Sequence, residues 1–236
     1  MKALKRVMWI ISIIPFIFTA FLIKGLPDTV PIHYDSNWKI DGYGSKYVDF
    51  LLPILIIVFT AVFAGVIRYK EKQAENTEDD RIRRDNEANA KSLAISAIVM
   101  ALFFVALQFA MIYGQFREFS GEAMKNSLNV GKVANIMIAV TLIVMGNFIP
   151  RTKKNGLIGI RTTWSMYNDV TWERSNRMGG KVLFITGIIL LPISFFTEQF
   201  AGIMWMFILL TVAVIIILVY SKKVYDEQKA LDEFKR

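Results

Sequence analysis

The hydrophobic residues of this chain are gathered into six long segments, and the charged residues lie mainly between them. Each segment approaches the length of about 17–25 residues that an α-helix needs to cross the apolar core of a bilayer. The fifth contains Pro192, which a membrane helix tolerates where its neighbours satisfy the freed carbonyl. The pattern predicts an all-α polytopic membrane protein, a single membrane domain over residues 1–236, with transmembrane helices at about residues 7–24, 50–68, 92–115, 132–150, 181–197 and 200–221.

The distribution of lysine and arginine predicts the orientation of these helices. If the N-terminus is inside, the inner segments hold 22 of the 28 basic residues and the outer loops hold six. Inner loops of membrane proteins carry an excess of basic residues. Both termini are therefore expected in the cytoplasm, with an outer motif loop at residues 25–49 and an inner motif loop at residues 150–180.

Composition agrees with a membrane protein, since 54% of the residues are hydrophobic and the mean hydropathy is +0.42. The formal net charge of +8 is explained by cations beside membrane helices, so direct nucleic-acid binding is disfavoured. The first segment has a basic start, but no small-residue cleavage site follows it, and we expect it to be retained as a helix. The chain has no cysteine, which excludes disulfides and thiolate metal sites.

The uncharged stretches inside the predicted spans lack the residues that membrane catalysis and ion coupling require. Ion-coupled transporters and pumps place ionisable side chains inside the bilayer, and none of the six uncharged stretches contains one. Sequence motifs of intramembrane metal or serine hydrolysis are also absent. His33 with Asp35 and Asp41 could coordinate a divalent ion, but a turn-forming or headgroup-facing histidine is the simpler interpretation. We therefore expect no enzyme activity, metal or cofactor.

The outer motif loop has a rigid entry and a turn. Pro27 and Pro31 favour an extended chain, and Asp41-Gly42 indicates a turn. The loop is interpreted as a stiff hairpin with interfacial aromatic residues, or as a docking surface for an extracellular ligand. The residues assigned to that surface are Pro27, Pro31, His33, Tyr34, Asp41, Gly42 and Lys46.

The inner motif loop interweaves asparagine, glycine, arginine and tryptophan. Asn155-Gly156 predicts a turn, Asn168 or Asp169 is expected to cap a short helix, and Glu173 with Arg177 forms a favourable i, i+4 pair. Trp164 and Trp172 are expected to anchor the loop at the membrane interface. The assigned residues, for partner binding or for structure, are Asn147, Pro150, Arg151, Asn155, Gly159, Arg161, Trp164, Trp172, Glu173, Arg177 and Gly180.

These two motifs resemble the SdpI family of bacterial immunity and signal-transduction membrane proteins. The inner resemblance extends from Gly146 to Trp164 and continues through Trp172 to Lys181. The outer one, from Leu26 to Lys46, is similar to a domain of unknown function that opens many of these proteins. Thr163 departs from the family, which commonly has proline there, so this loop is expected to be less rigid.

The resemblance implies a multi-pass protein of the bacterial plasma membrane that protects against a secreted peptide toxin. It also implies signalling, in which a cytoplasmic repressor is held at the membrane. The expected partners are therefore membrane lipids, a toxin outside and a repressor inside. Two alternatives stay open: a general envelope-stress or lipid-associated membrane protein, and a membrane enzyme or transporter.

Overall fold

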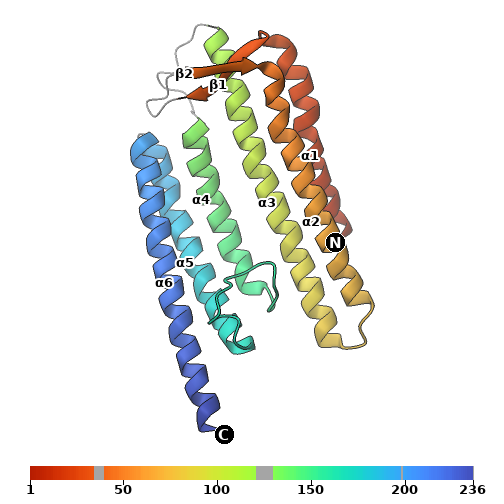
Figure 1. Cartoon of the computed structure of the whole chain (residues 1–236), viewed down its shortest axis with the longest axis vertical. Coiled ribbons are helices and arrows are strands. Elements are labelled where there is room, and N and C mark those ends of the chain that lie inside the picture. The colour runs from red at the N-terminus through yellow and green to blue at the C-terminus, as the bar shows by residue number, and fades with distance from the viewer. Residues whose placement is uncertain (35–39, 121–129, 198, 236) are drawn as a thin grey trace. The chain divides into compact units, whose positions relative to one another are not determined.

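The computed structural model describes residues 1–34, 40–120, 130–197 and 199–235, the side chains of Tyr34 and Gln199 excepted. Over these residues it has six helices long and apolar enough to cross a membrane, which confirms the predicted all-α polytopic architecture. The orientation with both termini inside stays a prediction. The helices are α1 (Lys2–Leu22), α2 (Leu51–Glu75), α3 (Asp80–Phe119), α4 (Val130–Phe148), α5 (Asp169–Phe196) and α6 (Gln199–Phe234) (Figure 1).

Five helices extend beyond the predicted spans into charged sequence, and α3, α5 and α6 extend furthest. α3 begins at Asp80, where Asp79 Oδ1 accepts hydrogen bonds from the backbone amides of Arg81 (2.7 Å) and Ile82 (3.2 Å). α5 begins at Asp169, and α6 continues to Phe234. The short helix expected after Asn168 is therefore the first part of α5, because no proline separates it from the fifth apolar segment and the helix continues through Gly179 and Gly180.

The chain divides into two compact units, each of which is described by itself. Unit 1 comprises Met1–Val62 and Ala97–Ala134, and unit 2 comprises Phe63–Ser96 and Asn135–Arg236. The single membrane domain stays a prediction.

Unit 1 contains the outer motif loop, which folds as a β-hairpin. Strands β1 (Thr29–Tyr34) and β2 (Ile40–Ser45) pair antiparallel, with Thr29 opposite Ser45 and an irregular register around His33 (Figure 1). Short 3₁₀ segments, Ile23–Gly25 and Lys46–Phe50, join the hairpin to α1 and α2. Val30 from β1 is buried with Ile23 and Leu26, against Phe50 and Phe116.

A buried polar cluster fixes this hairpin to the helices of unit 1. Asp49 is 3% exposed, and its Oδ1 accepts a hydrogen bond from Gln115 Nε2 at 3.0 Å. The same amide lies 3.3 Å from the Pro31 carbonyl of β1. Gln108 Nε2 donates to the Asp49 carbonyl at 2.9 Å and to Thr19 Oγ1 at 3.3 Å. Buried polar groups need such partners, so the cluster determines how the hairpin meets α1 and α3.

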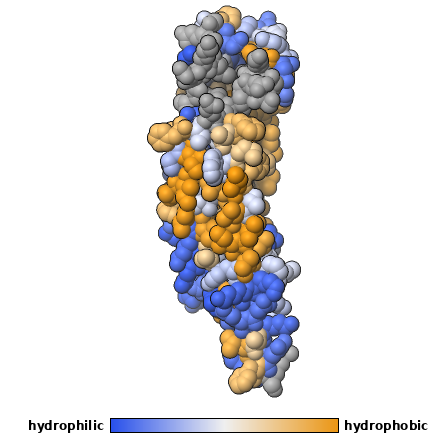
Figure 2. All heavy atoms as spheres, turned by 90° about the vertical axis from the view of Figure 1, so that its left-hand side faces the viewer, coloured by the Kyte–Doolittle hydropathy of each residue, from blue (hydrophilic) through white to orange (hydrophobic). Residues whose placement is uncertain are grey.

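Unit 2 contains the inner motif loop together with α5 and α6, which pack side by side (Figure 1). Arg174 Nη1 bonds Glu227 Oε2 at 2.8 Å, and Tyr167 donates to Asp232 Oδ2 at 2.9 Å. These contacts tie the charged end of α6 to the start of α5. Figure 2 shows a hydrophobic band on the α6 side of the protein, with hydrophilic residues towards the C-terminal end. This arrangement is that of a helix leaving an apolar layer.

Candidate functional site

Asn155 organises the turn at the beginning of the inner motif loop. Its Oδ1 accepts hydrogen bonds from the backbone amides of Leu157 (2.7 Å) and Ile158 (2.9 Å). Its Nδ2 lies within hydrogen-bonding distance of the carbonyls of Lys153 (2.6 Å) and Ile158 (3.1 Å). The asparagine thus replaces the backbone partners that a turn lacks, as the Asn155-Gly156 sequence predicts.

Asn89 connects this turn to α3. The Asn89 side chain is buried, and its Oδ1 accepts a hydrogen bond from the backbone amide of Lys153 at 3.1 Å. Asn155 Nδ2 lies 3.3 Å from the same oxygen. Two asparagines, distant in sequence, therefore hold the loop against the charged beginning of α3.

Trp172 connects the loop to α5. Its ring nitrogen donates to the Thr152 carbonyl at 2.9 Å, and the residue is 2% exposed. The expectation that Trp172 anchors the loop at the membrane interface is therefore wrong. The indole is instead a buried support, because Thr152 offers an acceptor inside unit 2.

Gly159 lies where the loop passes closest to α5. Its φ of 127° is a conformation that favours glycine. A Cβ at this position would lie 2.7 Å from both Asn176 Oδ1 and Trp172 Cη2. The buried Asn176 side chain accepts a hydrogen bond from the Ile160 amide at 2.7 Å. The absence of a side chain at Gly159 thus allows the loop to lie close to α5, and the hydrogen bond from Ile160 to Asn176 stabilises this contact.

The second half of the loop is closed by hydroxyl and amide caps. Ser165 Oγ accepts from the Thr162 amide at 2.8 Å and donates to the Ile160 carbonyl at 2.7 Å. Asn168 and Thr171 form a reciprocal capping box at the start of α5, which confirms Asn168 as the predicted cap. This network gives the loop internal order on both sides of Thr163.

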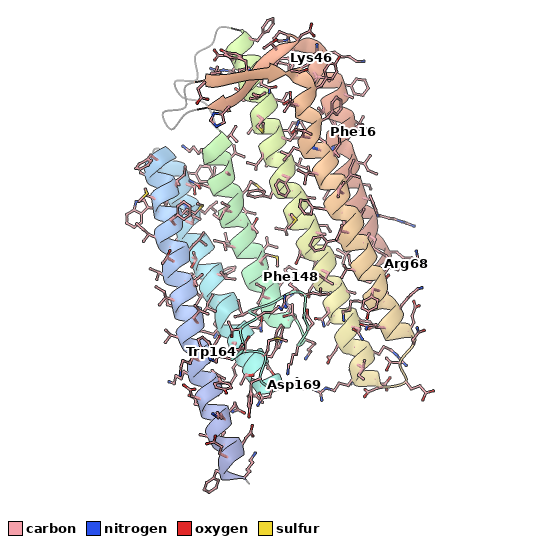
Figure 3. All side chains as sticks on the ribbon, in the orientation of Figure 1. Phe16, Lys46, Arg68, Phe148, Trp164 and Asp169 are labelled. Atoms are coloured by element: carbon pink, nitrogen blue, oxygen red, sulfur yellow. The ribbon has the colours of Figure 1, made fainter. Side chains whose placement is uncertain are left out.

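A cavity of about 810 Å³ lies between this ordered loop, the first turns of α3 and the start of α5. Its lining is mainly charged, and it includes the basic Arg81, Arg84 and Lys153 as well as the acidic Asp85 and Glu173. Arg81 forms an ion pair with Asp169 across it. Figure 3 shows Trp164 and Asp169 at this end of unit 2. A charged, partly enclosed surface of this kind suits a polar partner.

The predicted inner residues separate into two groups. The first supports the loop: Asn155, Gly159, Trp172 and Gly180, with the partly exposed Pro150 and Trp164. The second is exposed, and it contains the predicted Glu173–Arg177 pair, with Arg177 Nη2 2.7 Å from Glu173 Oε1. The exposed group is Asn147, Arg151, Arg161, Glu173 and Arg177.

The predicted outer residues separate in the same way. Lys46 is largely structural, because its ammonium lies 3.0 Å from Asp28 Oδ1 and donates to the Leu26 carbonyl at 3.1 Å. Pro31 is buried. Gly42 lies close to His33, because a Cβ added at Gly42 would lie only 2.9 Å from the Cβ of His33. His33 and Asp41 are exposed and hydrogen-bonded to each other.

Two parts of the outer prediction lie outside the described residues. The side chain of Tyr34 is one, and Asp35, the third residue of the metal alternative, is the other. Pro27 is partly exposed at the entry to the hairpin. Among the residues that the structure describes, no group of three or more acidic or histidine side chains is placed to hold a metal ion.

Sequence reasoning missed the residues that receive the loop rather than form it. Asn89 lies in a charged stretch of α3 with no recognisable turn signal, and Asn176 follows the conspicuous Trp172-Glu173 pair without a motif of its own. Asp49 and Gln115 in unit 1 are further examples. Their only signal is a polar residue at the edge of an apolar segment, which indicates burial without naming the partner.

Residues 151–221 match the model of the SdpI/YfhL protein family, and residues 10–57 match a domain of unknown function, DUF1648. The immunity protein SdpI of Bacillus subtilis (strain 168) is 24% identical over 218 residues, which cover 92% of this chain and 94% of that protein. No solved structure matches the chain significantly.

The two family matches coincide with the two motif loops. The first covers the inner motif from Arg151 onwards and continues along α5 and most of the apolar part of α6. The second covers α1 from residue 10 onwards, both strands of the hairpin and the start of α2. Together with six spanning helices, they identify a multi-pass cell membrane protein. The chain carries an SdpI/YfhL family region behind a DUF1648 region, and the resemblance to the SdpI family that its motifs indicate is confirmed.

Proposed function

We propose that this SdpI-like membrane protein protects its cell against a secreted peptide toxin and signals the toxin's presence to a cytoplasmic repressor. The observation that carries the proposal is the similarity to an immunity protein over 92% of the chain. The proposed activity is recognition, and it includes no catalytic step or cofactor.

The inner motif loop is proposed as the main functional surface, which is needed for protection and which also meets the repressor. Asn89, Asn155 and Trp172 fix its backbone through buried hydrogen bonds. Exposed Arg151 and Arg161 then stand on a framework that needs little ordering on binding. A preorganised surface loses less conformational entropy in the complex, which supports a docking role for this loop.

The outer motif loop is proposed as the surface that meets the toxin. Lys46 and the contact of Gln115 with Pro31 hold the hairpin to unit 1. His33 and Asp41 remain exposed on it. In the proposed orientation this hairpin lies outside the cell, where a secreted peptide is met first.

The direct test is survival of a toxin-sensitive host that lacks its own immunity gene. The host carries either the chain or an empty vector, and both are exposed to a dilution series of the purified peptide. Protection predicts survival at concentrations that kill the vector control. If the chain is present in the membrane at normal levels and both hosts die at the same dose, the proposal of immunity is wrong.

The signalling part is tested separately by fractionation of a tagged candidate repressor. With the chain present, the toxin is expected to move the repressor from the soluble to the membrane fraction. A repressor that stays soluble in a protected host would contradict sequestration while leaving immunity intact.

A further inference from the structure

Unit 2 has a second groove, and apart from Arg151 the proposed function does not use its residues. It lies between the end of α4 and the middle of α5 and encloses about 500 Å³. Arg151, Arg177 and Lys181 line one part of it, and Phe184 and Ile185 line another. Cations and apolar side chains therefore share one continuous surface.

The groove exists because α4 and α5 approach closely at two glycines. A Cβ on Gly146 would lie 2.5 Å from the Phe184 amide nitrogen, and one on Gly180 would lie 2.6 Å from the Gly146 carbonyl oxygen. Larger residues would separate the helices. Beside this contact, the side chains of Phe184 and Ile185 are left 40% and 56% exposed.

The charge at the polar part of the groove is positive. No acidic residue of the described chain lines it. Arg177 bonds Glu173, but Arg151 bonds the neutral carboxamide of Asn147 at 3.3 Å and lies over the Phe148 ring. Neither Arg151 nor Lys181 has an ion pair with any residue that the structure describes. The groove thus retains cations to which an anion could bind.

The position of the groove along the helices indicates what that anion carries. The apolar stretch of α4 ends at Phe148, and that of α5 begins after Lys181. The cations therefore stand at the boundary of the apolar layer, and Phe184 and Ile185 stand within it. A ligand that fits both parts has an anionic group joined to a hydrocarbon chain.

We propose that this groove binds an anionic phospholipid, with the phosphate at Arg151 and Lys181 and an acyl chain along Phe184 and Ile185. Basic pockets between membrane helices bind anionic headgroups, and a planar guanidinium can donate hydrogen bonds to two oxygens of a phosphate at once. The proposal is independent of immunity, because it depends on the groove and its charges alone.

The test is retention of phosphatidylglycerol and phosphatidylcholine by the purified full chain, measured by native mass spectrometry. The unchanged protein is expected to retain phosphatidylglycerol preferentially. The double variant Arg151→Gln/Lys181→Gln is expected to lower that retention about 30-fold, because each cation lost should lower it about fivefold. Ile185→Ser keeps both cations and is expected to lower it about fivefold through loss of acyl-chain contact.

A matched control removes the same charge elsewhere near the membrane. Lys222→Gln/Lys223→Gln alters two exposed lysines where the apolar part of α6 ends, and retention should change less than about threefold. Arg151→Lys/Lys181→Arg, which keeps the charge, should restore retention and so separates lost binding from misfolding. Equal loss in the control, equal retention of both lipids, or displacement of the lipid by inorganic phosphate would overturn the proposal.

Discussion

Replacing Asn155 with alanine is expected to release the inner motif loop from its fixed conformation. The side chain accepts two backbone hydrogen bonds, from Leu157 and Ile158, and its amino group has three acceptors within 3.3 Å for two hydrogens. It therefore makes up to about four hydrogen bonds, each with a net contribution of about 0.5–1.5 kcal/mol. The local opening free energy of the loop should fall by about 2–4 kcal/mol.

Hydrogen exchange at the Leu157 and Ile158 amides measures this loss directly, because both amides donate to Asn155. A fall of about 2–4 kcal/mol corresponds to exchange about 30- to 900-fold faster at those positions. Asn155→Asp keeps the acceptor for both amides and loses the donor, so its exchange should be intermediate.

Lys153→Ala is the matched control for this experiment. It lies two residues away, its side chain is exposed, and its backbone amide can still donate to Asn89. Its exchange at Leu157 and Ile158 should equal that of the unchanged chain. If Asn155→Ala also leaves those rates unchanged, the network does not hold the loop and the reasoning is refuted.

Three further predictions address the loop, its surface and the orientation. Gly159→Ala places a Cβ 2.7 Å from Trp172 at a φ of 127°. The displaced loop should be cleaved by trypsin within residues 151–161 at least tenfold faster, and an unchanged cleavage rate would contradict the packing of Gly159 against α5. Arg81→Ala removes the ion pair with Asp169, in which the two side chains are 70% and 63% exposed. The free energy of unfolding in detergent should therefore change by less than about 1 kcal/mol, and a larger loss would show that the pair stabilises the fold. The chain has no cysteine, so a single introduced cysteine reports its own position. Ser45→Cys should react with a membrane-impermeant maleimide in intact cells, and Glu78→Cys should react only after lysis. The reverse result would contradict the predicted orientation.

The pattern of the sequence predicts the spanning helices well, because a bilayer requires long apolar segments whatever their neighbours are. It predicts where helices end less well. α3 and α6 continue through charged residues, since no glycine or proline stops them and ion pairs such as Arg174–Glu227 support them in water. Hydropathy alone reports where a helix leaves the apolar layer and does not report where the helix ends.

The turns and caps of the inner motif loop could be predicted from the sequence, but its contacts with distant residues could not. Asn155-Gly156 indicates a turn, and Asn168 indicates a cap, because each acts within a few residues. Trp172 was assigned to the interface, since tryptophan is enriched there. Its burial depends on the Thr152 carbonyl, 20 residues earlier, and on the fold that brings the two together.

The central claim is that exposed residues of the inner motif loop confer immunity, and Arg161 tests it most directly. Arg161 is exposed, and its side chain makes no hydrogen bond or ion pair with the residues that the structure describes, so its removal should leave the fold intact. A sensitive host carrying the unchanged chain, Arg161→Ala or the exposed-lysine control Lys223→Ala is titrated with purified toxin peptide at equal membrane levels of each protein. Arg161→Ala is expected to lower the toxin dose that the host tolerates at least tenfold, while Lys223→Ala is expected to leave it unchanged. Protection by Arg161→Ala equal to that of the unchanged chain would contradict it.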